Sequence, residues 1–326
     1  MEGKSMPRQC LFMILVLLYA GFPASSQSIS TFSIVARDSS TGELGIAVAS
    51  KFFAVGAVVP WAQADVGAIA TQSFANTSFG WRGLELLEAG ATPTEVSAVL
   101  LRNDEDPGRR QFGIVDSRGH SHTYTGQGCI AWAGGRNGRN YAIQGNILTG
   151  ESVVIAMEEA FLATKGTLAD RLYASLIAGD REGGDSRGKQ SSSLLVVKRG
   201  AGYGGYTDRA IDVRVDDHAE PFVELGRLLR YAQMNYAWNE GWTLFTQRKA
   251  REALPHIERA VTYAPDNPEL LYDLAVIRLA DGKAQGALGA LAEAIRLNPK
   301  LKVQARNDSD LANLRTHELF QEIVKE

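Results

Sequence analysis

Cysteine is almost absent from this sequence, which has only Cys10 and Cys129 among its 326 residues. Cys10 lies in an N-terminal segment that we expect to be removed, so Cys129 would be left without a partner. An intramolecular disulfide is then excluded, and the mature fold must depend on its apolar core. Cys129 lies in the apolar stretch CIAWAG, which favours a buried structural thiol over a nucleophile.

The sequence also lacks a strong charge of one sign. Its formal net charge is −3, which gives no electrostatic argument for nucleic acid or an anionic membrane as a partner. The glycine clusters lack the G-x-x-x-x-G-K-[ST] spacing that cradles phosphates, and no clear helix follows residues 134–138 to complete a dinucleotide-binding motif. We therefore interpret these clusters as tight turns: Gly134-Gly135, Gly183-Gly184 and residues 202–206 (GYGGY).

Long hydrophobic runs are lacking except near the N-terminus. Residues 10–20 (CLFMILVLLYA) follow the basic Lys4 and Arg8 and precede the small residues Ala24, Ser25 and Ser26. This order predicts a signal peptide over residues 1–26 and a secreted or periplasmic protein. The run is too short to span a bilayer comfortably. An uncleaved membrane anchor is the alternative.

Short strand patterns and helical patterns fill residues 30–218, which we expect to form one α/β domain. Two hairpins are predicted around the turns at residues 38–42 and 117–119. The hairpins and helix pairs alternate in blocks, which favours antiparallel sheets with helices outside them. The predicted strands are 32–36, 44–49, 58–61, 66–73, 111–116, 121–125, 192–197 and 211–215, and the predicted helices are 81–89, 94–102, 151–164 and 168–178.

A repeat appears in the last third of the chain. Ala253-Leu254, Ala260 and Pro265 recur as Ala287-Leu288, Ala294 and Pro299, each 34 positions later. This is the period of the tetratricopeptide repeat, in which small residues lie where the two helices of a unit press together. We expect an all-α repeat segment over residues 221–326, with capping helices at 221–232 and 310–324. Two interpretations stay open: a helical stabiliser and a groove that docks a protein partner.

Three blocks carry a resemblance to a known family. They are TFSIVARDSSTGELGIAVASKFFAVGAVVPWAQADVGAIATQSFANTSFG (31–80), YAIQGNILTG (141–150) and GGDSRGKQSSSLLVV (183–197). Together they resemble the domain of unknown function 1028 family, which is placed in the superfamily of N-terminal nucleophile hydrolases. The resemblance implies a four-layer αββα sandwich. It also implies hydrolysis of a small amide or related C–N bond.

In that superfamily the first residue of the processed chain supplies the chemistry, and Thr31 matches this position. A threonine hydroxyl needs an adjacent base, and a free α-amine, which titrates near pH 8, can serve. Ser50 and Lys51 end the second strand of the first hairpin, so they should lie beside Thr31. Lys51 could lower the pKa of the amine by like-charge repulsion. Without the resemblance, Ser50 and Lys51 would be interpreted as a turn residue and a solvated strand end.

Further polar residues are candidates for substrate contacts. Asn146 and Asn76 could donate to an oxyanion or orient the substrate, although asparagine is also common in turns. A polar loop before an apolar strand holds Asp185, Arg187, Gln190 and Ser191 as candidate substrate-binding groups. Arg187 could grip a carboxylate in bidentate fashion. A structural Asp185–Arg187 pair is the equal alternative.

The expected leader complicates this mechanism. Cleavage after Ser26, the site that we slightly prefer, would leave residues 27–30 ahead of Thr31, and a second trimming step or a different mechanism would be needed. Cleavage after Ser30 would expose Thr31 directly. The rival hypothesis is therefore a binding or scaffold protein without catalysis, whose repeats do the work.

We expect no cofactor and no metal. His120 and His122 share a strand face, and residues 216–218 are polar, but no third ligand lies near either group. The expected partners are a small amide-type substrate and a protein at the repeats, with no nucleic acid, and no membrane after removal of the signal. A homo-oligomer is left open.

Overall fold

A computed structural model gives the arrangement of residues 31–325. The predicted signal peptide at residues 1–26 lies outside these described residues. None of the helices in the described part combines the length and the apolar character that crossing a bilayer requires.

Within residues 31–325, ten strands form two antiparallel sheets. The six-stranded sheet has the order β10-β9-β2-β1-β8-β7, and the four-stranded sheet has the order β3-β4-β5-β6. The strands are β1 (Thr31–Arg37), β2 (Leu44–Ser50), β3 (Pro60–Gln63), β4 (Gly67–Ser73), β5 (Arg110–Asp116), β6 (Ser121–Thr125), β7 (Gly134–Gly138), β8 (Tyr141–Asn146), β9 (Ser191–Val197) and β10 (Arg209–Val215). The prediction of antiparallel sheets is confirmed. The interpretation of Gly134-Gly135 as a tight turn was wrong, because these residues begin the edge strand β7.

The alternation of side chains in β1 assigns its two faces. Val35 belongs to a buried cluster that includes Ile46 of β2 and Ala68 and Val115 of the other sheet. Ile34 instead packs in a second cluster with side chains of helices α3, α4 and α5. Since successive side chains of a strand point to opposite faces, Thr31 and Ser33 lie on the face of Val35, between the sheets.

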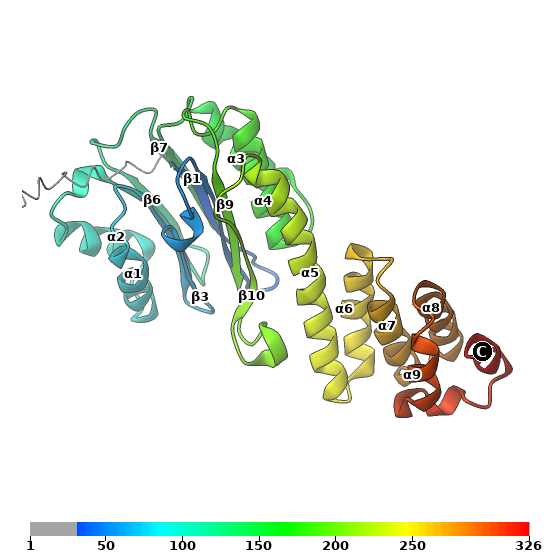
Figure 1. The fold of residues 1–326 in the computed structure, drawn as a ribbon. Helices are drawn as coiled ribbons and strands as arrows, with labels where there is room; N and C mark the ends of the chain where they lie inside the picture. Colours follow the sequence, from blue (N-terminus) through cyan, green and yellow to red (C-terminus); the bar gives the residue numbers. More distant parts are fainter. Residues whose placement is uncertain (1–30, 326) are drawn as a thin grey trace, which may run out of the picture.

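Helices cover the outer faces of both sheets (Figure 1). Helices α1 (Ser78–Glu88) and α2 (Pro93–Arg102) pack on the four-stranded sheet through Ile69, Phe112 and Ile114. Helices α3 (Ser152–Ala163) and α4 (Leu168–Arg181) pack on the six-stranded sheet. Thr92 with Glu95 and Thr167 with Asp170 form capping boxes at the starts of α2 and α4, as such spacing favours. Short 3-10 turns lie at Val55–Ala57, Pro107–Arg109 and Tyr203–Gly205.

Replacing Gly80 with alanine should destabilise the protein, although alanine is the better helix former. A Cβ added at Gly80 of α1 would lie 2.1 Å from Cγ of Trp61, so the helix or the indole must shift. We expect a loss of about 1–3 kcal/mol in the free energy of unfolding, measured with urea. The control is Gly289→Ala in α8, where a Cβ meets nothing within 4 Å. That variant should gain up to about 1 kcal/mol, and equal effects at the two sites would contradict the packing argument.

The rest of the chain is helical, as predicted. Its elements are α5 (Pro221–Thr246), α6 (Ala250–Tyr263), α7 (Pro268–Ala280), α8 (Ala284–Leu297), α9 (Leu301–Asn307), a 3-10 turn at Ser309–Leu314 and α10 (Glu318–Ile323). The small residues of the 34-residue repeat are fully buried at helix contacts, including Ala253, Ala260, Ala287 and Ala294. Where the first unit has Gly241, a Cβ would lie 2.7 Å from a carbon of Ile257, so the two helices approach too closely for a larger residue.

Both predicted capping helices differ from the observed ones. The first does not end near residue 232, because α5 runs on without a break into the first repeat unit. The second, predicted over 310–324, is divided into the 3-10 turn and α10, and His317 caps α10 with its ring nitrogen. As a result α5 joins the two parts of the chain (Figure 1), packing on β9 and β10 at one end and on α6 at the other.

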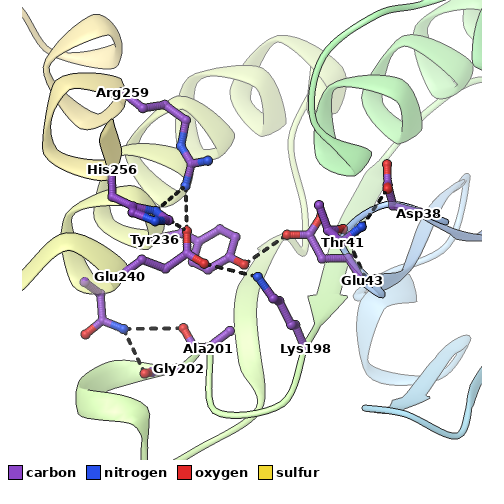
Figure 2. A network of polar contacts seen from close by, with 11 residues as sticks. Asp38, Thr41, Glu43, Lys198, Ala201, Gly202, Tyr236, Glu240, His256 and Arg259 are labelled. Carbon is purple, nitrogen blue, oxygen red and sulfur yellow. Dashed lines mark hydrogen bonds and ion pairs between the residues drawn. The ribbon is translucent and has the colours of Figure 1, made fainter. Parts of the chain in front are cut away.

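Glu240 of α5 is the centre of a polar network at this junction (Figure 2). Its carboxylate accepts hydrogen bonds from Lys198 Nζ at 3.3 Å and from Arg259 at 2.6 Å, and it lies 3.1 Å from His256 Nδ1. Burial by itself raises the pKa of Glu240. The bond with His256 and the charges of Lys198, His256 and Arg259 outweigh burial and lower this pKa to about 2.

This depressed pKa predicts an acid-sensitive junction. The network stabilises the folded chain fully above about pH 4.5, and its contribution is lost as the pH falls towards 2, because the carboxylate must then take up a proton. Glu240→Gln should therefore cost about 2–3 kcal/mol near pH 6 and much less near pH 3, in urea unfolding of the full chain. A difference between wild type and variant that does not change with pH would contradict this account.

Candidate active site

Four polar residues line up across four neighbouring strands of the six-stranded sheet. Thr31 is paired with Ser50 of β2 on one side and with Asn146 of β8 on the other. Ser50 is in turn paired with Ser191 of β9. Directly opposed residues in antiparallel strands share a face, so this row lies on the face of Thr31, at the end of the space between the sheets. Three of the four side chains carry a hydroxyl and Asn146 carries an amide. We call these four residues the hydroxyl row.

Thr31 is held on both its side chain and its backbone. Its Oγ1 donates to Ser50 Oγ at 3.3 Å, and its carbonyl oxygen accepts from Gln72 Nε2 at 3.1 Å. Thr31, Ser50 and Asn146 are each at most 1% exposed. The hairpin argument therefore placed Ser50 correctly beside Thr31.

Three buried glutamines connect the two sheets next to the hydroxyl row, and sequence reasoning missed them. Gln111 Oε1 accepts from Gln72 Nε2 at 2.9 Å and from Asn146 Nδ2 at 2.8 Å. Gln144 Nε2 donates to Ser33 Oγ at 2.6 Å, and Ser33 Oγ donates to Gln72 Oε1 at 2.5 Å. We call Gln72, Gln111 and Gln144 the glutamine network. One glutamine in each of β4, β5 and β8, beside apolar residues such as Ile69, Phe112 and Ile143, was the signal that could have revealed it.

Two residues beside the site have left-handed backbone conformations. Ile147, directly after Asn146, has φ 51°, and Ser73, directly after Gln72, has φ 67°. A β-branched residue rarely adopts this conformation, and such strain gathers at functional sites. Ile147 is fixed there by hydrogen bonds from its N–H to Ile130 O at 2.9 Å and from Ser186 N–H to its carbonyl at 3.0 Å.

The polar loop before β9 contacts the end of β2 through the Asp185 side chain and through its own backbone. Buried Asp185 accepts from the backbone N–H of Lys51 at 2.8 Å and from the guanidinium of Arg187 at 3.2 and 3.1 Å. The structural Asp185–Arg187 pair is thus present. Lys51 is exposed, and its Nζ donates to Lys189 O at 3.4 Å.

The remaining candidates lie at different places. The Gln190 side chain donates to Asp217 at 3.1 Å, and Ser191 Oγ donates to Phe52 O at 2.5 Å. The Asn76 side chain donates to Asp104 at 2.8 Å and accepts from Ser78 N–H at 3.1 Å, at the start of α1. The structure therefore groups Thr31, Ser50, Asn146 and Ser191, and it gives the Asn76 side chain a role in the turn before α1.

A cavity of about 220 Å³ opens beside Ser50. It is lined by Phe32 and Phe222 and by the polar Asp180, Asp185 and Lys189. Of the hydroxyl row, Ser50 alone lines this cavity, because Phe32 and Phe222 belong to the helix-covered face of the six-stranded sheet.

Cys129 and His120, the other candidate reactive groups, have no role in this site. Burial raises the pKa of the Cys129 thiol, which disfavours the reactive thiolate. His120 Nδ1 lies 2.8 Å from Asp116 Oδ2. Among residues 31–325, no three His, Cys, Asp or Glu side chains are placed to hold a metal ion.

Comparisons with known proteins agree with the division of the chain. Residues 31–225 match the model described as a family of unknown function, DUF1028, and residues 239–301 match a tetratricopeptide repeat model. No curated protein matches the chain. The crystal structure of protein SPO2555 from Silicibacter pomeroyi, titled with the same family model, is similar at 30% sequence identity with a TM-score of 0.57. The similarity covers 63% of this chain and 89% of that chain. The chain therefore belongs to the DUF1028 family of unknown function, and it continues into tetratricopeptide repeats.

Proposed function

We propose that residues 30–218 form an N-terminal nucleophile hydrolase domain that cleaves a small amide or related C–N bond. The layers support this: helices, the four-stranded sheet, the six-stranded sheet and helices again correspond to an αββα sandwich. The observation that carries the proposal is the position of Thr31. It heads a central strand, its side chain lies between the sheets, and its hydroxyl is bonded to Ser50 Oγ.

The reaction follows from the two groups that a terminal Thr31 would bring together. The α-amine takes the proton from Oγ1 while Oγ1 attacks the substrate carbonyl and forms a C–O bond. Asn146 donates to the oxyanion that develops. The tetrahedral intermediate then breaks its C–N bond, and the leaving amine takes the proton from the α-ammonium. Water hydrolyses the resulting ester, releases the acid and restores the hydroxyl.

This chemistry requires that processing end at Thr31. We propose that the segment ahead of it, with the signal peptide over 1–26, directs export to the periplasm or exterior and is removed in one or two steps. The N-terminal mass of the purified, exported protein tests this. A species that begins at Thr31 is expected, and a stable, active species that begins at Gln27 would contradict the mechanism.

A binding function through the repeats is the second candidate. A groove of about 900 Å³ lies between α5 and the connection of α6 to α7, and it is lined by Arg230, Tyr231, Met234 and Pro265. Tyr231 is 56% exposed there, as expected of a protein-docking aromatic. This candidate is favoured if the processed chain keeps residues ahead of Thr31 and hydrolyses none of a panel of small amides.

A further inference from the structure

A second cavity, of about 300 Å³, lies at the junction of the sandwich and the repeats. Its wall comes from the β1–β2 turn, the start of α4, strands β9 and β10, and helices α5 and α6. Thr31 begins β1 and this turn follows its end at Arg37, so the cavity lies about 20 Å from the hydroxyl row. It is separate from the candidate active site.

A buried carboxylate faces this cavity without a cation of its own. Glu43 is 7% exposed and accepts a hydrogen bond from Tyr236 Oη at 2.9 Å (Figure 2). Among the described residues no ion pair includes Glu43, and the Lys198 ammonium is bonded to Glu240 at 3.3 Å. Burial raises the pKa of Glu43, and the hydrogen bond from Tyr236 and the charge of Lys198 offset this only in part. Its charged form is therefore incompletely compensated, as is expected where a positive group is missing.

The charges of the wall favour a cation over an anion. Two carboxylates, Asp38 and Glu43, line the cavity, and Arg259 is the one guanidinium among its described lining residues. Arg259 is already engaged by Glu240 at 2.6 Å. Hydrogen bonds from Ser40 and Thr41 and the charge of Arg171 outweigh burial and lower the pKa of Asp38, so that carboxylate is ionised at neutral pH. Arg171 pairs with Asp38 at 3.6 Å, so Glu43 is the lining carboxylate that has no ion pair among the described residues, and it would repel an anionic ligand.

The remainder of the wall is apolar and aromatic. Leu168, Val196 and Ile211 line it together with the rings of Tyr236 and Tyr263. Aliphatic side chains suit a compact hydrocarbon body, and tyrosine rings attract an organic cation through their faces. A bare metal ion would leave this apolar wall without a partner, so the lining fits an organic cation best.

We propose that this cavity binds a small organic ammonium or guanidinium compound, whose cationic group pairs with Glu43 and whose hydrocarbon part contacts the Tyr236 and Tyr263 rings. Glu43 belongs to the sandwich, Tyr236 to α5 and Tyr263 to α6. The ligand would therefore contact both parts of the chain at once and stabilise their junction.

Thermal unfolding of the full chain with matched probes tests this site. The probe is n-butylammonium, and its neutral counterpart is 1-butanol. n-Butylammonium should raise the Tm in the millimolar range, and 1-butanol should raise it much less. Glu43→Gln should weaken the apparent affinity by about tenfold or more, since a charge-assisted contact is lost. Exposed Glu159 of α3 provides the control variant Glu159→Gln, which should leave the affinity unchanged.

A second variant tests the same site in case Glu43→Gln fails to fold. Ala169 lines the cavity, and Ala169→Met should fill it and abolish the Tm increase while leaving Glu43 in place. Equal stabilisation of the wild type by n-butylammonium and 1-butanol would overturn the proposal. So would an absence of any effect of n-butylammonium, or an unchanged affinity in a folded Glu43→Gln or Ala169→Met variant.

Discussion

Thr31→Ala should lower kcat/KM for amide hydrolysis by more than about 10³-fold, because it removes the attacking oxygen and leaves the α-amine in place. The variant protein should stay folded. The folded state should tolerate the change, since Thr31 Oγ1 makes a long hydrogen bond of 3.3 Å to Ser50. The measurement is turnover of a panel of small amides by the fully processed protein, with its mass confirming an N-terminus at residue 31.

Two further variants make this result specific. Thr31→Ser keeps a hydroxyl on the same terminal residue and should retain measurable turnover, whereas Thr94→Ala, at an exposed position of α2, should have full activity. Residual turnover by Thr31→Ala close to that of wild type would rule out the proposed nucleophile. If Thr31→Ala alone blocks processing, the mass spectrum separates that outcome from a loss of chemistry.

The local part of the fold could be predicted from the sequence because its signals are local. Strand alternation and the Asp38–Gly42 turn define the first hairpin, and the antiparallel register then brings Ser50 opposite Thr31. The 34-residue spacing of Ala260 and Ala294 identified the repeats, because close helix packing demands a small residue in each unit.

The rest depends on contacts between segments far apart in the chain. Gln72, Gln111 and Gln144 meet because β4 and β5 pack face to face on β1 and β8, and no spacing along the sequence reveals that stacking. The sequence patterns indicated a boundary between residues 218 and 221 but not a continuous helix. Helix α5 continues past residue 232 because its buried positions, such as Leu229 and Ala237, contact the two-sheet domain first and the repeats next.

Gln111→Leu should cause one of the largest losses of stability of any single substitution in the two-sheet domain. Gln111 is fully buried, and its Nε2 donates to Gly145 O at 2.7 Å and to Thr125 Oγ1 at 3.0 Å. Its Oε1 accepts from Gln72 and Asn146. Leucine has a similar size but leaves these buried partners unsatisfied. We expect a loss of about 3–5 kcal/mol in the free energy of unfolding, measured with urea.

The comparison with Gln63→Leu separates burial from residue type. Gln63 is on the edge strand β3 and donates to Glu88 at the surface, at 3.1 Å, so its replacement should change the stability by less than about 0.5 kcal/mol.

Because Gln111 also positions Asn146 beside Thr31, Gln111→Leu should reduce turnover even at temperatures where the variant is folded. A variant as stable as wild type would mean that an apolar contact between the sheets replaces the glutamine network without loss. The glutamine network would then contribute nothing to stability. The loss of turnover in the folded variant would measure its contribution to positioning Asn146.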